Sequence, residues 1–221
     1  MDFMNLLKGI EELLYECLSW VIFYPLTLIR AAFRPLSMMR YAERELTENV
    51  PAQFDDTISP PIFLVVTLLL SHLLQLGLGV SSTAGMPAAF DDTGNLLMFR
   101  AIALGLFPLL LALQSVLLRK VKLTRQSLRP AFYGQCFTAA PLILASALVL
   151  IFAQHGETGA WVATAIGALA LGWYVTVQTI WFRQGGTGWL KAGSTAFLTV
   201  LVTFVLVTGF SALTTMTAAK M

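Results

Sequence analysis

Apolar residues occur along the chain in five long runs that are separated by short polar segments. Each run has close to or more than the roughly twenty residues that an α-helix needs to cross the hydrocarbon core of a bilayer. The runs are continuous and do not alternate between apolar and polar residues, as the strands of a membrane β-barrel do. The pattern predicts an all-α protein, a polytopic membrane helix bundle with five transmembrane helices at about 61–80, 96–118, 131–153, 159–182 and 192–216.

The segment before the first run, residues 1–59, has a different pattern. Its most apolar part, 17–29, is shorter than a membrane span, and runs of about 10–14 residues are more often interfacial or re-entrant. Pro25 and Pro35 are expected to divide the segment into amphipathic helical pieces. We therefore predict a cytoplasmic layer of amphipathic, interfacial helices over 1–59 and a transmembrane domain over 60–216. The pattern is compatible with 17–29 being interfacial, re-entrant or spanning.

Composition narrows the class of protein. Hydrophobic residues make up 57% of the 221 residues and charged residues 12%, with a mean hydropathy of +0.76. A typical soluble domain has about 25% charged residues, so a water-soluble globular enzyme is excluded, and a chain this apolar is not intrinsically disordered. The formal net charge of +2 gives no extended basic surface, which excludes nucleic acid as a partner.

Basic residues are distributed unequally among the polar segments. Twelve of the fourteen Lys and Arg residues precede the first apolar run or follow the second and fourth runs, whereas the segments after the first and third runs have none. The positive-inside rule places the basic segments in the cytoplasm. This predicts an integral protein of the cytoplasmic (inner) membrane with its N-terminus inside and its C-terminus outside. Residues 1–59 contain five basic and nine acidic residues, so apolar burial rather than lipid charge is expected to hold that segment on the membrane.

Polar residues within the apolar runs are the candidates for chemistry. His72 is the one titratable residue deep inside a run; such residues often line a pathway for ions or solutes, but they also hydrogen-bond between helices. Arg100 enters the second run from the outer side, where it is expected to snorkel, to pair with Asp91 or Asp92, or to bind a substrate or lipid headgroup. The candidate intramembrane site consists of His72, Gln75, Arg100, Gln114 and Gln135.

Two further features concern the shape and packing of the predicted helices. Pro108 and Pro141 lie inside the second and third runs, where prolines kink helices and either shape a cavity or are accommodated by neighbouring helices. The fourth run has small residues whose spacing permits close helix approach, within the chain or in a homodimer. These small residues are Gly159, Ala163, Gly167, Ala168 and Gly172.

The tetrapeptide Phe-Asp-Asp-Thr occurs twice, at 54–57 and 90–93, each time shortly before an apolar run. Acidic and hydroxyl residues there satisfy free backbone N–H groups and suit the helix dipole, so both copies are predicted to be helix starts. They are expected on opposite sides of the membrane and cannot form one carboxylate pair. Cys17 and Cys136 lack the spacing of metal ligands, so no metal site is predicted.

The segment FDDTISPPIFLVVTLLLSHLL at 54–74, combined with the five-span plan, resembles the Yip1 family of integral membrane proteins, including its bacterial members. Members of that family often have an acidic, proline-containing start to the first span. The resemblance implies a non-enzymatic membrane protein. Eukaryotic relatives act in vesicle traffic and bind small GTPases and one another, and bacterial relatives are sometimes labelled permeases. The resemblance assigns no site residue.

These features predict a non-enzymatic integral membrane scaffold or interaction protein, with no catalytic residue, metal or cofactor. Its expected partners are membrane lipids and either another membrane protein or a second copy of the chain. The alternative is a permease-like component that transports small solutes or lipids through polar groups inside the bundle. Transport requires His72, Gln114 and Gln135 to face one cavity, whereas a scaffold requires only separate packing contacts.

The predicted orientation can be tested with C-terminal fusions. Five spans and an inside N-terminus place the C-terminus outside, so an alkaline phosphatase fusion should be active and a green fluorescent protein fusion dark. Enzyme activity and fluorescence of cells expressing the two fusions give the measurement. An inactive phosphatase together with a bright fluorescent fusion would reverse the orientation.

Overall fold

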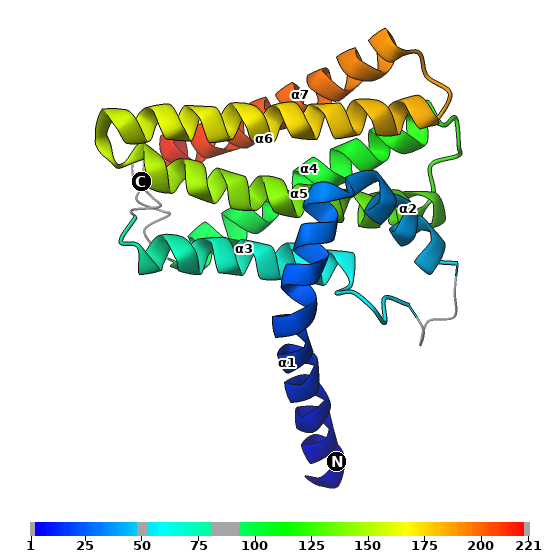
Figure 1. Ribbon diagram of the computed structural model, residues 1–221, viewed down its shortest axis with the longest axis vertical. Coiled ribbons are helices and arrows are strands. Elements are labelled where there is room, and N and C mark those ends of the chain that lie inside the picture. Colours follow the sequence, from blue (N-terminus) through cyan, green and yellow to red (C-terminus); the bar gives the residue numbers. More distant parts are fainter. Residues whose placement is uncertain (1–2, 48–52, 81–92, 219–221) are drawn as a thin grey trace.

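The computed structural model describes residues 3–47, 53–80 and 93–218, and every regular element in those ranges is an α-helix. Five helices are long and apolar enough to cross a membrane, as the apolar runs predicted. They form an antiparallel bundle, across which α1 projects (Figure 1). In chain order the helices are α1 (Phe3–Phe33), α2 (Pro35–Glu45), α3 (Pro60–Gly77), α4 (Thr93–Leu118), α5 (Arg125–Ala153), α6 (Gly156–Gln184) and α7 (Trp189–Ala218).

The two ends of the bundle differ in charge. One end has α2, the start of α3, and the α4–α5 and α6–α7 connections, and it contains the basic residues of those segments. We call it the basic end. The other end has the end of α3, the start of α4 and the α5–α6 connection. An ion pair of 2.7 Å between Arg119 and Glu43 joins α2 to the α4–α5 connection at the basic end.

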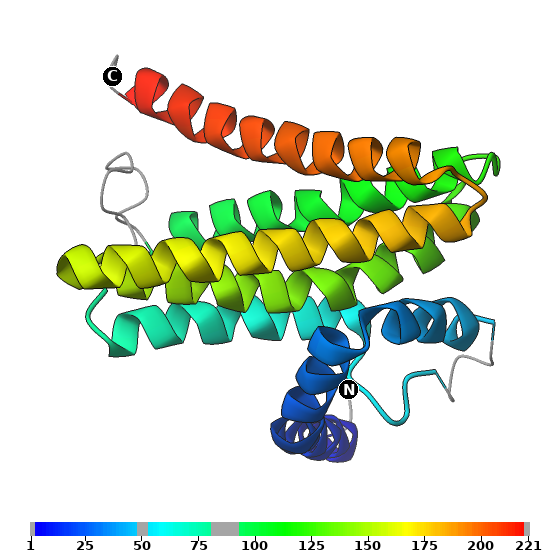
Figure 2. The same ribbon diagram turned by 45° about the horizontal axis from the view of Figure 1, so that its top comes forward.

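Helix α5 is the centre of the fold. It packs against α1, α2, α3, α4 and α6, whereas α7 packs against α4 and α6 and slants away from the bundle toward its C-terminal end (Figure 2). The middle of α5, residues 134–140, is buried throughout and includes Gly134, Ala139 and Ala140. Small residues let helix backbones approach closely in a membrane, where burial from water does not drive helices together.

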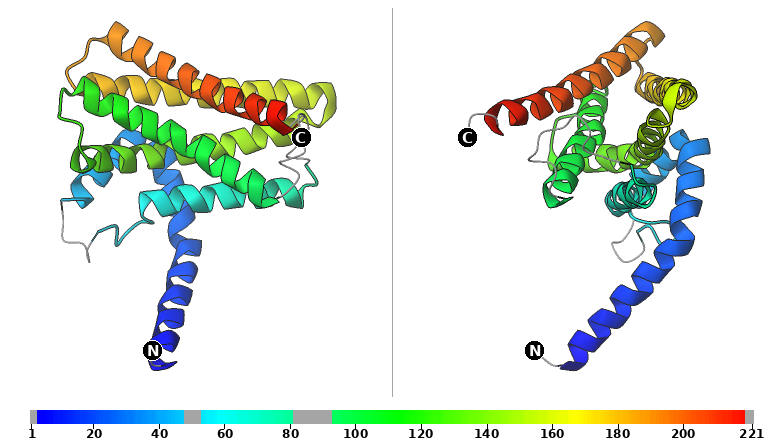
Figure 3. Two further views of the ribbon diagram at one scale, coloured as in Figure 1. Left: turned by 180° about the vertical axis from the view of Figure 1, so that it is seen from behind. Right: turned by 90° about the vertical axis from the view of Figure 1, so that its left-hand side faces the viewer.

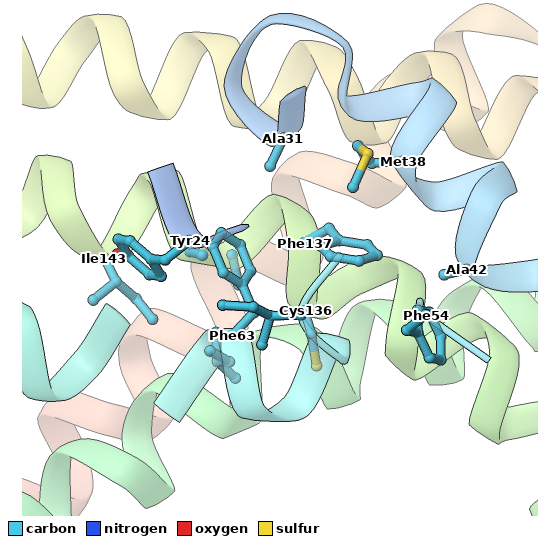
Figure 4. Close-up of a cluster of buried hydrophobic side chains, with 13 residues drawn as sticks. Tyr24, Ala31, Met38, Ala42, Phe54, Phe63, Cys136, Phe137 and Ile143 are labelled. Carbon is cyan, nitrogen blue, oxygen red and sulfur yellow. The ribbon is translucent and has the colours of Figure 1, made fainter. Parts of the chain in front are cut away.

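The N-terminal segment shares a core with the bundle. Figure 4 shows the cluster, in which Tyr24 of α1, Met38 of α2 and Phe54 surround residues of α3 and α5. The rings of Phe63 and Phe137 lie 5.8 Å apart between α3 and α5. The predicted boundary at residue 59 therefore separates segments of different sequence pattern that pack together.

Helix α5 begins before its apolar run because a capping box starts it in the basic segment. The hydroxyl of Thr124 accepts a 3.1 Å hydrogen bond from the Ser127 N–H, and the Thr124 N–H donates a 3.0 Å bond to the Ser127 hydroxyl. These two bonds satisfy backbone donors that a helix start leaves free. The helix thus extends from the apolar run into the connection at the basic end.

The expected helix break at Pro25 is wrong, whereas the break before Pro35 is confirmed. Helix α1 continues through Pro25. An internal proline removes only one backbone hydrogen bond, and the buried residues Tyr24 and Thr27 anchor α1 on both sides of Pro25. Arg34 leaves the helical conformation (φ −131°, ψ 51°), as residues before a proline tend to do. Helix α1 crosses the bundle rather than running parallel to its helices (Figure 3).

The predicted role of residues 54–57 as a cap for α3 is also wrong. Ser59 is the residue that precedes α3, and no side chain caps the helix there. Pro60 and Pro61 begin the helix, and because proline has no N–H group, fewer donors need a partner. Asp56 instead binds side chains of α1 and α2. Of the second copy, residues 90–92 lie outside the described residues, and α4 begins at Thr93.

The small residues of α6 lie on two different surfaces of the helix, one in contact with α5 and one exposed. A Cβ atom on Gly159 would come within 2.3 Å of the Phe152 carbonyl oxygen, and one on Gly167 within 3.6 Å of a Val149 methyl group. These glycines therefore permit the contact with α5. Gly172 is exposed and has nothing within 4 Å of a Cβ position, so it takes no part in that contact.

Helix α2 depends on a glycine of α5. A Cβ atom on Gly134 would lie 3.4 Å from backbone and side-chain atoms of Met39, which is fully buried. Replacing Gly134 by leucine should separate α2 from α5 and destabilise the protein by about 1–3 kcal/mol through overpacking. The measurement is the melting temperature in detergent, followed by tryptophan fluorescence. The matched control is Gly172→Leu, which should leave it unchanged; equal shifts would show that α2 needs no close approach.

Candidate functional site

Three of the candidate polar residues meet between α3 and α4, near the end of the bundle opposite the basic end. His72 and Gln75 are three residues apart on α3, so they share a face, and both are buried. Arg100 of α4 reaches them: its Nη1 lies 3.3 Å from His72 Nδ1, and its Nη2 donates a 2.9 Å hydrogen bond to Gln75 Oε1. The structure thus joins residues that the sequence placed on separate runs.

These contacts determine the protonation of His72. A guanidinium group only donates, so Nδ1 must accept, and the neutral imidazole then has its proton on Nε2. Nε2 is buried and has no hydrogen-bond partner within the described residues. The cluster therefore combines a half-buried cation, Arg100, with an N–H donor that lacks an acceptor. Such a pair of donors suits an anionic or carbonyl ligand.

The groups that contact the Arg100 guanidinium within the described residues are neutral. No ion pair to Arg100 occurs in the described ranges, and the carboxylates predicted as its partners, Asp91 and Asp92, lie outside them. A half-buried cation without a counter-ion loses much of its hydration. Hydrogen bonding to Gln75 and His72 replaces part of it.

Gln135 lies elsewhere, in the contact between α5 and α6. Its Nε2 donates a 2.8 Å hydrogen bond to Oε1 of Gln178, and Nε2 of Gln178 donates a 2.7 Å bond back to Oε1 of Gln135. Both side chains are fully buried, and the Thr138 hydroxyl lies beside them. The two amides satisfy each other, which describes an interhelical packing contact. The sequence analysis missed Gln178, although a glutamine inside the fourth apolar run was the available signal.

Gln114 occupies a third place. It is half-buried and lines a groove of about 320 Å³ between α4 and α7, with Thr195 and Thr199 on the opposite wall. The groove lies between the second half of α4 and the first half of α7. Its other lining residues are Leu110, Leu113, Leu198 and Val202. Neither His72 nor Gln135 lines it.

The two prolines do not connect these places. Helices α4 and α5 continue through Pro108 and Pro141. Pro108 is buried, and Pro141 lines an apolar hollow of about 290 Å³ together with Ala32 and Trp173. The candidate residues therefore occupy three separate places, and the described structure brings only His72, Gln75 and Arg100 together.

A second polar cluster, which the sequence analysis missed, joins α1, α2 and the segment before α3. The Tyr41 hydroxyl donates a 2.5 Å hydrogen bond to one oxygen of Asp56 and lies 3.2 Å from the Thr57 hydroxyl. Arg30 donates a 3.2 Å bond to the other Asp56 oxygen. Burial, followed by the bond to the Asp56 carboxylate, raises the pKa of Tyr41. The phenol therefore keeps its proton at neutral pH and remains a donor.

Neither cluster has the ligand set of a metal site. Within the described ranges, no three His, Cys, Asp or Glu side chains lie close enough together to hold a metal ion. Cys136 is a free, buried thiol in the core between α3 and α5. The chemistry that the arrangement offers is hydrogen bonding and charge recognition.

Comparison of the chain with protein-family models, curated proteins and solved structures finds no match. The resemblance to the Yip1 family therefore stays a prediction from residues 54–74 and from the five-span plan.

The Gln135–Gln178 pair should stabilise the bundle as a unit. Gln135→Leu or Gln178→Leu alone leaves the other amide buried with only the Thr138 hydroxyl as a side-chain partner, and each should cost about 0.6–2 kcal/mol. The double variant should lose less than the sum of the two. Melting temperatures of the four proteins in detergent measure this coupling, and Gln114→Leu, in the groove, is the control with no expected change. Strictly additive losses would refute the coupling.

Proposed function

We propose that the chain is a non-enzymatic scaffold or interaction protein of the cytoplasmic membrane, and that the N-terminal part of α1 is its interaction surface. This part, residues 3–18, which we call the arm, extends beyond the bundle (Figure 1, Figure 3). Leu7, Leu14 and Leu18 are spaced to share one face of the arm, and Leu14 and Leu18 are 59% and 68% exposed. An uncovered apolar helix face of this kind suits a membrane surface and a partner helix.

The separation of the polar groups supports this proposal. A transport pathway needs polar groups that face a common cavity, whereas Gln135 is paired with Gln178 and Gln114 lies in a different groove. The proposal agrees with the resemblance to the Yip1 family, whose members are non-enzymatic. The partner would be a membrane protein or a second copy of the chain, with an apolar helix at the cytoplasmic face where the positive-inside rule places the arm.

The test compares co-purification by the full chain and by an arm variant. A partner should copurify stoichiometrically from membranes in mild detergent with the natural chain and be lost with Leu7→Ala/Leu14→Ala/Leu18→Ala, because that variant shortens the exposed face without touching the bundle. The control replaces three exposed residues of the spanning helices, Leu169, Leu171 and Leu201, by alanine. It should retain the partner. Absence of any stoichiometric partner, or its retention by the arm variant, contradicts the proposal.

A transport function is the second candidate. The observation that favours it is the Nε2 of His72, which has no hydrogen-bond partner among the described residues, on an imidazole that contacts Arg100. Proton flux into liposomes loaded with a pH-sensitive dye provides the test. Flux that requires the natural chain and disappears with His72→Gln and Arg100→Gln would replace the scaffold proposal. Flux equal to that of empty liposomes would remove proton transport from consideration.

A further inference from the structure

A pocket at the junction of α1, α2 and the segment before α3 has a basic lining. It measures about 290 Å³, at the lower end of the volumes of small-ligand sites, which are about 300–1,000 Å³. We call it the basic pocket. The residues that matter here are Arg30, Arg34, Tyr41, Arg44, Asp56 and Thr57.

The charge of the basic pocket is unbalanced. Among the described residues, Asp56 is its one acidic lining residue, and it pairs with Arg30 at 3.2 Å. Arg34 and Arg44 form no ion pair within the described residues. Three other arginines at the basic end contact aromatic rings: the guanidinium groups of Arg119, Arg129 and Arg183 lie 4.0–5.2 Å from ring centres. The pocket therefore has two guanidinium groups available to an external anion.

The N-terminus of α2 adds to the attraction for an anion. Helix α2, which has eleven residues, begins at Pro35, and Ser37 of its first turn lines the pocket. Pro35 has no N–H group, and the Ser37 N–H donates a 3.1 Å hydrogen bond to the Arg34 carbonyl oxygen. The contribution of α2 is therefore the partial positive charge of its N-terminus, which favours phosphate. The Tyr41 phenol also lines the pocket, but it donates its proton to Asp56, so it holds that carboxylate in place and offers no free donor to an anion.

The position of the pocket matches the headgroup level of a bilayer. Asp56 and Thr57 precede Pro60, the first residue of a spanning helix, by one turn. On α1, Arg30 stands beside Ile29 and Phe33, which form an apolar stripe one turn long and are 56% and 82% exposed. A charged group in the pocket and an apolar chain along this stripe would be contiguous. This is the pattern of an amphiphile at a membrane interface.

We propose that the basic pocket binds the phosphate group of an anionic phospholipid, with Arg34 and Arg44 as donors to the phosphate oxygens. The acyl chains lie along the exposed stripe formed by Ile29 and Phe33. The apolar stripe is the reason to assign a lipid rather than a soluble phosphate compound. The pocket takes the lipid whether or not the arm also binds a partner protein, so the two proposals can fail separately.

The experiment titrates the detergent-purified full chain with dioleoyl-phosphatidylglycerol or dioleoyl-phosphatidylcholine in mixed micelles. The rise in melting temperature, followed by tryptophan fluorescence, gives an apparent affinity for each lipid. Phosphatidylglycerol should raise the melting temperature more than phosphatidylcholine does. The variant Arg34→Gln/Arg44→Gln should weaken the apparent affinity for phosphatidylglycerol by about fivefold for each arginine removed.

Two further variants distinguish binding in the basic pocket from a general effect of positive charge. Lys122→Gln/Arg125→Gln makes the same charge change at the basic end outside the pocket and should keep the natural affinity. Arg34→Lys/Arg44→Lys keeps the charge in place and should retain most of it. Equal stabilisation by phosphatidylcholine, or an equal loss in the control variant, overturns the proposal. If the Arg34→Gln/Arg44→Gln variant does not fold, the single variant Arg34→Gln is tested instead. An unchanged affinity of that variant for phosphatidylglycerol overturns the proposal.

Glycerol 1-phosphate distinguishes a lipid phosphate from the phosphate of a soluble compound. It should stabilise the protein far less than phosphatidylglycerol, because it cannot occupy the apolar stripe. If it stabilises the protein equally and displaces the lipid, the assignment to a lipid is wrong and the pocket belongs to a soluble phosphate compound.

Discussion

In a bilayer, burial of apolar surface from water does not hold helices together, so close approach and buried polar contacts must do so. Helix α5 provides both in adjacent residues. Gly134 permits α2 to approach, and Gln135 exchanges hydrogen bonds with Gln178 of α6. Successive residues of a helix point to different sides, so the same turn of α5 holds α2 and α6 on different faces. Helices α1, α3 and α4 also pack against α5, and α7 packs against α4 and α6.

Because helix α2 is held against α5, it also fixes the position of residues at the basic end. Met38 joins the core of α1, α3 and α5, and the next residue, Met39, joins the core of α4, α6 and α7. A short helix that contributes to both cores has little freedom to move. Tyr41 and Arg44 of the basic pocket are therefore fixed by contacts made deep in α5, although both lie at the bundle end.

The sequence predicts the five spans because hydropathy is a local property, and it misses features that depend on distant partners. The start of α5 could have been found, since Thr124 and Ser127 are close in sequence. Asp56 was assigned to a helix start because its partner Tyr41 lies fifteen residues away. The sequence marks His72 and Arg100 each as unusual. Which polar groups meet depends on how each helix is rotated about its axis, and a helix that is apolar on all sides gives no sequence signal for that rotation. Gln135 could not be matched to Gln178 for the same reason.

Net charge is a poor guide to how residues 1–59 meet a membrane. The segment is acidic in total, which argued against electrostatic binding to lipid. The chain turn at Arg34, however, brings Arg30 and Arg44 to one pocket, where, in the part of the chain that the structure describes, one carboxylate opposes three arginines. Since electrostatic attraction weakens within about 8–10 Å at physiological salt, a bound phosphate responds to this local set rather than to the segment total. Charge recognition at the interface therefore follows from the turn between α1 and α2, which proline at position 35 imposes.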